Sequence, residues 1–132
     1  MPAVTSTGYA FNRTRGAYLA TELSLANTHW SRLRGLMGTD AATFSAGKAL
    51  WIVPCRGVHT FAMRFPIDVV YLDRGQVVVH IERGLRPWRM APVRMSATSV
   101  LELPPNTLAG SGTSVGDELE IGMGQRPEAV HS

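Results

Sequence analysis

A cysteine, a histidine and a methionine are spaced four residues apart near the middle of the chain, as Cys55, His59 and Met63. The spacing is similar to that of the copper loop of cupredoxins, in which a thiolate, an imidazole and a weak axial thioether bind one ion. Such a site needs a second imidazole, but His29 lies in a segment with a helical pattern and the other two histidines follow the loop. We therefore favour the alternative, in which the cysteine and the methionine fill the core, and we predict no metal or other cofactor.

A nucleophilic site is the second interpretation of the same segment. Cys55 would supply the thiolate, His59 the base, and Asp68 the carboxylate that orients the base. Catalytic cysteines lie in electropositive surroundings, often at the N-terminus of a helix. Arg56 supplies a positive charge, but the sequence after it predicts no helix, so catalysis is kept as the alternative to binding.

Asp68 is expected on a strand, on the same face as two apolar residues. A carboxylate in apolar surroundings needs a partner, and Arg34 and Arg64 are the natural candidates. One interpretation is an ion pair that fixes a helix to the sheet. The other is a shallow ligand pocket lined by Asp68, Arg64 and His59, although His59 could equally be a core histidine.

The segment Arg86-Pro87-Trp88-Arg89 is a stiff loop that presents an indole ring between guanidinium groups. Trp and Arg are the residues that most often anchor protein interfaces. Trp88 could equally fold back as a lid over one end of a barrel. The same residue types also bind single-stranded nucleic acid, but the chain lacks an RNA-binding signature, so nucleic acid is not predicted as a partner.

The elements that must position these residues are predominantly strands. Apolar and polar residues alternate in short runs that are separated by turns rich in Gly, Pro and Asp, a pattern typical of a half-buried sheet. We expect strands at residues 9–12, 17–26, 49–53, 58–65, 67–72, 76–83 and 97–103, and a last strand that ends at residue 121. Residues 106–114 are small and polar, with room for one helical turn.

One longer helix is expected, from a cap at residue 27 or 28 to a stop at residue 38. Trp30, Leu33 and Met37 are three and four residues apart, so they share a face. Gly35 inside such a helix costs about 1 kcal/mol relative to Ala, which suggests that the backbone of another segment packs closely against it.

The composition is that of one domain. A chain of 132 residues, of which 45% are hydrophobic, can bury about two-thirds of its unfolded surface. We expect a single β domain over residues 1–132, with a core at residues 9–121 and a loose tail from residue 122. The lone Cys55 excludes an intramolecular disulfide, and no apolar run has the form of a signal peptide or the length of a membrane span. The cytoplasm is therefore the expected location.

Arginine dominates the charge of the chain. The net charge is +3, twelve of the thirteen basic residues are Arg, and residues 48–94 hold eight basic residues against three acidic ones. These arginines can form an ordinary solvated surface. They are also suited to forked contacts with a carboxylate or a phosphate, so a small anionic ligand is considered beside a protein partner.

Several motifs along the chain occur in a familiar order. They are Arg34-Gly35-Leu36-Met37, residues 59–63, 65–70 and 100–104, and Val115-Gly116-Asp117. With these motifs the chain resembles the domain of unknown function 192 family over roughly residues 17–121. The resemblance implies a small all-β fold, barrel-like or jelly-roll-like, with a short helix at the Arg-Gly-Leu-Met segment. It implies no assigned reaction, cofactor or substrate.

We therefore predict a small all-β domain with one short helix packed on it. Its expected role is non-catalytic binding of a protein partner or a small anionic ligand. The alternative is a thiol- or metal-dependent enzyme, or a copper-binding protein, that uses Cys55 and His59. The residues expected on the binding face are His59, Arg64, Asp68, Arg34, Trp88, Arg86 and Arg89.

Overall fold

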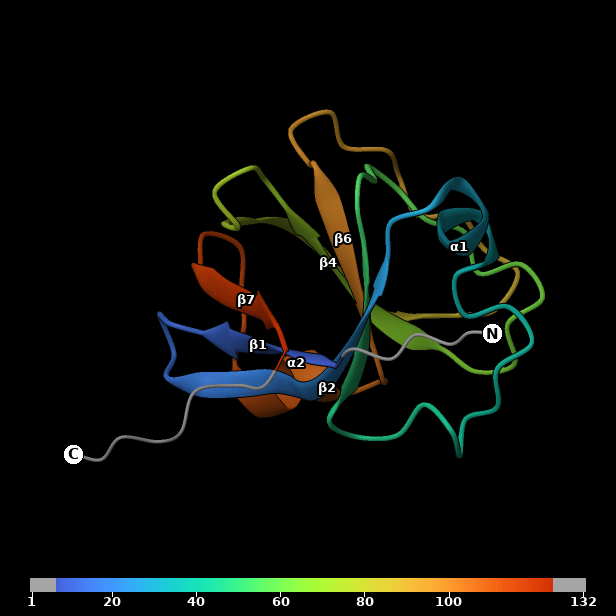
Figure 1. Cartoon of the computed structure of the whole chain (residues 1–132), viewed down its shortest axis with the longest axis horizontal. Helices are drawn as coiled ribbons and strands as arrows, with labels where there is room; N and C mark the ends of the chain where they lie inside the picture. The colour runs from blue at the N-terminus through green and yellow to red at the C-terminus, as the bar shows by residue number, and fades with distance from the viewer. Residues whose placement is uncertain (1–6, 125–132) are drawn as a thin grey trace.

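A curled sheet of seven strands forms the framework of the protein (Figure 1). This computed structural model describes residues 7–124, without the side chains of Trp30 and Leu33. The strands are β1 (Gly8–Asn12), β2 (Ala17–Ala26), β3 (Lys48–Ile52), β4 (Ile67–Leu72), β5 (Val78–Leu85), β6 (Ser99–Leu103) and β7 (Leu119–Met123). Their order across the sheet is β5-β4-β6-β3-β2-β1-β7. Only β2 and β3 pair in parallel, and the other neighbours are antiparallel.

The two edges of the sheet approach each other, which turns the sheet into a half-barrel. Val77 and Glu118 form a single bridge between the segments that lead into β5 and β7. Beside it the amide of Val78 donates to the carbonyl of Asp117 at 2.9 Å. The predicted barrel-like all-β class is confirmed. The expected short helix is α1 (His29–Arg34), and the helical turn allowed for at residues 106–114 is α2 (Thr107–Ser111).

The strands β4 and β6 are buried along their whole length, because the curl of the sheet and the loops cover both faces. Successive side chains of a strand point to opposite faces. Ile67, Val69 and Tyr71 accordingly pack into one core cluster, and Val70 and Leu72 pack into a second one. The alternation predicted for residues 67–72 is confirmed.

The helix α1 is shorter than predicted. Its N-cap is Thr28, whose hydroxyl accepts from the amide of Ser31, and Ser31 reciprocates in a capping box. It ends at Gly35, which has φ 51° and ψ −127° and therefore cannot continue a helix. The prediction of a helix that runs through Gly35 to residue 38 was wrong, because Gly35 supplies a positive φ rather than close packing against another backbone. The predicted face of Trp30 and Leu33 lies outside the described side chains.

The strand predicted at residues 58–65 is absent. His59 forms one isolated bridge with Met90, and the segment then turns, since the amide of Met63 donates to the carbonyl of Thr60 and Ala62 has φ 61°. A positive φ ends any run of extended residues. The segment is therefore a loop that lies across one face of the sheet, and this loop carries most of the candidate site.

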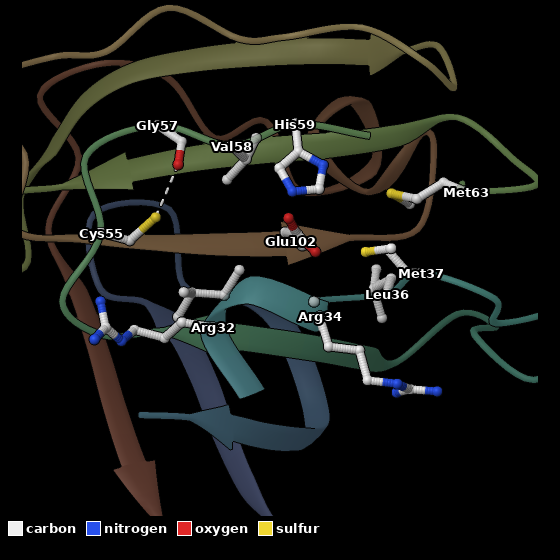
Figure 2. A pocket seen from close by; sticks show the side chains of 12 residues that line it. Arg32, Arg34, Leu36, Met37, Cys55, Gly57, Val58, His59, Met63 and Glu102 are labelled. Atoms are coloured by element: carbon white, nitrogen blue, oxygen red, sulfur yellow. Dashed lines mark hydrogen bonds between the residues drawn. The ribbon is translucent and has the colours of Figure 1, made fainter. Parts of the chain in front are cut away.

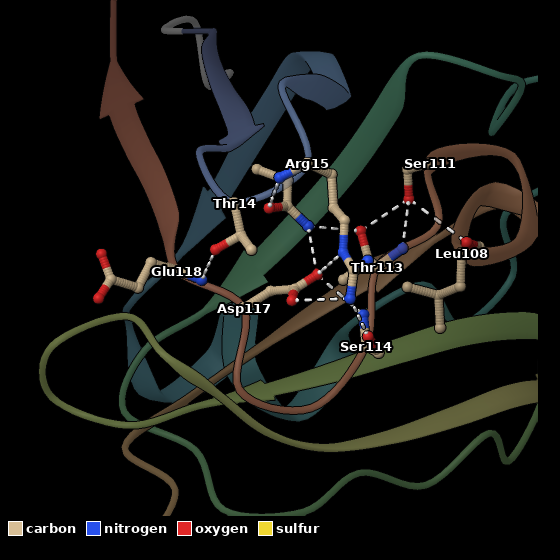
Figure 3. A network of polar contacts seen from close by, with 9 residues as sticks. Thr14, Arg15, Leu108, Ser111, Thr113, Ser114, Asp117 and Glu118 are labelled. Atoms are coloured by element: carbon tan, nitrogen blue, oxygen red, sulfur yellow. Dashed lines mark hydrogen bonds and ion pairs between the residues drawn. The ribbon is translucent and has the colours of Figure 1, made fainter.

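A network of polar contacts joins the turn after β1 to the segment before β7 (Figure 3). Asp117 is its buried centre: its Oδ2 accepts from Arg15 Nε and Asn12 Nδ2, each at 2.9 Å, and from the amide of Ser114 at 3.0 Å. The hydrogen bond from Arg15 is the main reason that the pKa of Asp117 is lowered to about 2. The network fixes the β1–β2 hairpin to β7, far from the loop of residues 55–63.

The C-terminal end of the sheet extends beyond the expected core. Gly122 and Met123 pair with Tyr9 and Gly8, so β7 continues two residues past residue 121. The remainder of the predicted loose tail, residues 125–132, lies outside the described residues, and the assignment of a single domain stays a prediction. Within residues 7–124, no helix is both long and apolar enough to span a membrane.

Candidate functional site

A small cavity lies between the turn that follows α1, the loop of residues 55–63 and the strand β6 (Figure 2). Its volume is about 50 Å³. We call it the Glu102 cavity, and the residues that line it include Met37, Cys55, Val58, His59, Met63 and Glu102. The lining is mostly apolar or sulfur-containing, so it contains few polar groups that could bind a ligand.

Glu102 forms the floor of the cavity. It lies in the middle of β6, in register with Val69 of β4 and Leu50 of β3, and is only 2% exposed. Its Oε1 is buried and has no hydrogen-bond partner. Burial raises the pKa of this carboxyl group to about 8. At neutral pH Glu102 is therefore mostly a neutral acid, because a buried carboxylate without a partner is costly.

Gly35 covers the Glu102 carboxyl group from the side of α1. A Cβ atom at position 35 would lie 3.9 Å from Glu102 Oε1. The positive φ of Gly35 ends the helix and directs Leu36 and Met37 toward the sheet. The Arg-Gly-Leu-Met motif thus forms one wall of the cavity, with the buried Leu36 anchored in the core.

His59 faces Glu102 from the opposite side. The amide of Phe61 donates to His59 Nδ1 at 3.2 Å, so in the neutral ring the proton is on Nε2. Figure 2 shows the imidazole ring directed down toward the Glu102 carboxyl group. His59 therefore presents an N–H donor to the cavity. This arrangement is the reverse of a histidine metal ligand, which usually binds through one nitrogen and donates from the other.

Cys55 lies at the edge of the cavity as a thiol. Its Sγ donates to the carbonyl of Gly57 at 2.9 Å, and burial raises its pKa. Met37 and Met63 direct their sulfur atoms into the cavity (Figure 2). Among the described residues there is no group of three His, Cys, Asp or Glu side chains placed to hold a metal ion.

Asp68 is held by backbone amides on the other face of the sheet. Its Oδ1 accepts from the amide of Gly84 and its Oδ2 from the amide of Leu108, both at 2.9 Å. The predicted ion pair of Asp68 with Arg34 or Arg64 is wrong, because two amide donors already satisfy this buried carboxylate. Asp68 shares its face with Val70 and Leu72, whereas Glu102 lies on the face of Val69. Asp68 therefore anchors α2 and the end of β5, and does not join His59.

The two arginines predicted to meet Asp68 lie elsewhere. Arg64 bonds Asp40 at 2.8 Å, and both side chains are largely exposed. Arg34 lines the cavity with its stem, but its guanidinium group points away from it in Figure 2. Arg32 also contributes to the lining, and its Nη1 donates to the carbonyl of Pro54 at 3.3 Å.

The Trp88 loop is tied to the loop of residues 55–63. The amide of Trp88 donates to the carbonyl of Thr60 at 2.9 Å, and the hydroxyl of Thr60 donates to the carbonyl of Arg86. Trp88 remains 63% exposed and stacks on Phe61, which in turn stacks on His59, with ring centroids 6.1 Å and 4.9 Å apart. The ring of Trp88 therefore lies on the surface and does not cover the core. Arg86 and Arg89 are exposed beside it.

Sequence reasoning missed Glu102 and Met37 as members of this site. Glu102 did leave a signal, because it is the only charged residue in the run Ser99–Leu103, whose other members are apolar or small. A charged residue in the middle of a buried strand is rare unless it is paired, so it indicates a functional or structural role. Met37 left none, since its sulfur reaches the cavity only because the chain turns at Gly35.

The comparisons with known proteins agree with this fold. A family model, DUF192, described as an uncharacterized ACR, matches residues 10–121. A UPF0127 protein of Thermococcus sibiricus is 29% identical over 126 residues, which cover 92% of this chain and 79% of the relative. A UPF0127 protein of Pyrococcus furiosus is 28% identical over 114 residues, which cover 83% and 94%. A crystal structure of a protein of unknown function from Novosphingobium aromaticivorans covers 91% of this chain and 92% of its own, with a TM-score of 0.74 at 19% identity, and supports the fold alone.

Proposed function

This chain belongs to the uncharacterized DUF192 family, and from its cavity we propose that it is a non-catalytic binding module whose ligand places a small anionic group beside Glu102. The observation that carries the proposal is the unpartnered carboxyl oxygen Oε1 of Glu102, which is buried at the floor of the cavity. Within the described residues, the other buried side-chain atom that lacks a hydrogen-bond partner is Arg32 Nε. Arg32 lines the same cavity, but its guanidinium group extends away from Glu102 in Figure 2.

Unpartnered polar atoms are rare in protein interiors, and each costs about 1–3 kcal/mol. A ligand that enters the cavity recovers part of this free energy. The donors that it meets are the N–H group of His59 and, at neutral pH, the protonated carboxyl group of Glu102. A set made of donors favours a ligand with acceptor oxygens, and an anion forms the stronger, charge-assisted hydrogen bonds.

The same groups speak against thiol chemistry. A nucleophilic cysteine needs a lowered pKa, whereas burial raises the pKa of Cys55. The thiol of Cys55 donates its hydrogen bond to the carbonyl of Gly57 and not to His59. Cys55→Ser keeps the size of the side chain and its donor to the carbonyl of Gly57 but removes the sulfur. This variant is therefore expected to leave ligand binding unchanged, and loss of binding in it would favour the enzyme or metal alternative.

The test of the binding proposal uses methyl NMR of the full chain with ¹³C-labelled methionine methyl groups. Met37 and Met63 report on the cavity, while Met95 and Met123, which are 74% and 38% exposed, are the reference signals. The probes are acetate, phosphate and nitrate, with methylammonium as the cationic control. We expect at least one anion to shift the signals of Met37 and Met63 but not those of Met95 and Met123. A response to methylammonium alone, or to no probe, would refute the proposal.

A protein partner is the second candidate, and it is supported by the exposed aromatic stack. Phe61, Trp88 and Met90 form an apolar surface beside Arg86 and Arg89, which we call the Trp88 surface. Large aromatic and arginine side chains anchor interfaces, and the guanidinium groups favour an acidic segment of the partner.

The cytoplasmic location expected from the sequence stays a prediction.

The partner proposal can be tested with short peptides. We expect a Phe-containing acidic peptide to bind the full chain in a fluorescence anisotropy titration, and a basic peptide of equal length not to bind. Trp88→Ser should abolish this binding, whereas Val115→Ser, at an exposed apolar residue elsewhere on the surface, should retain it. Equal binding of both peptides, or equal loss in both variants, would count against the Trp88 surface.

A further inference from the structure

We infer that the Glu102 cavity binds the carboxylate group of a small organic acid, and that Glu102 meets this carboxylate as a neutral acid with which it shares one proton. The inference rests on the proposed function and names the ligand class for the same site.

The hydrogen bonds require a ligand that accepts. The amide of Phe61 occupies Nδ1 of His59, so the nitrogen that faces the cavity carries a proton. Glu102 Oε1 has no partner within the protein. A carboxylate has two oxygens with several acceptor positions, so it can accept from His59 with one oxygen and pair with the Glu102 carboxyl group through the other.

The charges require that Glu102 be neutral when the ligand is bound. Besides Glu102, the charged or titratable residues that line the cavity are Arg32 and Arg34 from α1, and Cys55 and His59 from the loop. The strand β3 contributes only the apolar side chain of Ile52 to the lining. Arg32 donates to Pro54, and the guanidinium group of Arg34 points away (Figure 2), so neither neutralises Glu102. Two carboxylates in one buried site cannot both be ionised, and such pairs share a proton. The raised pKa of Glu102, about 8, leaves that proton in place at neutral pH.

The size and the walls of the cavity favour a short acid. The cavity volume is about 50 Å³, whereas about 10–15 Å³ on the same measure holds one water molecule. The space therefore admits a ligand of a few non-hydrogen atoms, such as a carboxylate with one methyl group. The flexible, apolar side chains of Met37 and Met63 can pack against that methyl group. A phosphate has no methyl group to pack there, and in its dianionic form it would bring a second charge that no cation in the cavity compensates.

The test compares acetate with phosphate and acetamide by methionine methyl NMR at about pH 7 and about pH 9. We expect acetate to shift the signals of Met37 and Met63 at the lower pH, and to bind about tenfold more weakly at the higher pH because Glu102 has lost its proton. Acetamide, which has the same shape but no charge, should bind more weakly than acetate. The wild-type protein alone therefore gives a first answer.

Two variants assign the effect to the cavity. Glu102→Gln keeps a donor but cannot share a proton, so its affinity for acetate should no longer change over this pH range. His59→Phe keeps the ring and removes the N–H donor, so it should bind acetate about tenfold more weakly. Glu118→Gln, at an exposed glutamate, is the matched control and should keep the wild-type pH dependence.

The possible failures separate the two proposals. If phosphate binds in preference to acetate, or acetate binds equally at both pH values, the proton-sharing inference is overturned while an anion site remains. If acetamide binds as well as acetate, the negative charge of the ligand is not recognised, and the inference is likewise overturned. If no anion shifts Met37 or Met63, both the inference and the binding proposal fail.

Discussion

Gly35 lies directly beside Glu102: a Cβ atom at position 35 would be 3.9 Å from Oε1 of the buried carboxyl group. The two residues are 67 positions apart in the chain, yet they form part of the wall and the floor of one cavity. Gly35 is required there by its backbone conformation and not by lack of space, because 3.9 Å is an ordinary contact distance. Substitutions at either residue can therefore be interpreted separately.

Gly35→Ala should lower the free energy of unfolding by about 1–3 kcal/mol, because an L-residue at φ 51° and ψ −127° is strained. Urea denaturation measures this loss. Gly110→Ala is the control, since Gly110 lies in α2 without a positive φ and has open space around its Cβ position. It should be neutral or stabilising by up to about 1 kcal/mol. Wild-type stability of Gly35→Ala would contradict the conformational argument.

Glu102→Gln should change the pH dependence of stability of the ligand-free protein. The folded-state pKa of Glu102, about 8, is above its ordinary value of 4.5. The folded state therefore holds the proton more tightly than the unfolded state between these values, and wild-type stability falls as the pH rises. The contribution is at most about 1.4 kcal/mol per pH unit. Relative to wild type, the variant should gain stability from about pH 5 to about pH 8, as measured by thermal unfolding.

The control for this experiment is Glu118→Gln, which removes an exposed carboxylate and should follow the wild-type curve. A constant stability difference between Glu102→Gln and wild type over the whole range would mean that Glu102 is ionised in the folded protein.

Asp68→Asn should destabilise the fold by about 2 kcal/mol. Asn can offer one acceptor oxygen, so its NH₂ group would face the amide of either Gly84 or Leu108, both of which now donate to Asp68. Asp40→Asn, which breaks the exposed contact with Arg64, should cost less than about 1 kcal/mol. Chemical denaturation of both variants gives the comparison. Loss of acetate binding in a folded Asp68→Asn protein would contradict the assignment of Asp68 to a structural role and would indicate that it contributes to the ligand site.

Asp117→Asn should be destabilising near neutral pH and almost neutral in strong acid. The pKa of Asp117 is lowered to about 2 from 3.8, chiefly by the hydrogen bond from Arg15. A lowered folded-state pKa stabilises the fold above the unfolded value, and this stabilisation is lost as the pH falls from about 4 to about 2. We expect a loss of about 2 kcal/mol at about pH 6. Unfolding curves at several pH values test this, and an equal loss at both ends of the range would exclude the charge as the cause.

The sequence by itself determined the class of the fold and much of the strand pattern. Alternating side chains in residues 67–72 are enough to assign the two faces of β4, because a strand has a period of two residues wherever it lies. A helix cap at residue 27 or 28 follows from side chains that can accept from the first turn of a helix, and the structure has it at Thr28. Such local rules do not depend on what lies across the sheet.

Only the tertiary structure decided which residues share a site. Asp68 and His59 are nine positions apart and were expected to meet, but the pleat places Asp68 on the opposite face, where the amides of Gly84 and Leu108 replace the expected arginine. Gly35, His59 and Glu102 come from three distant segments and meet because the chain turns after α1 and a loop crosses the face of β6. Long-range packing sets such contacts, and it also sets the burial that raises the pKa of Glu102.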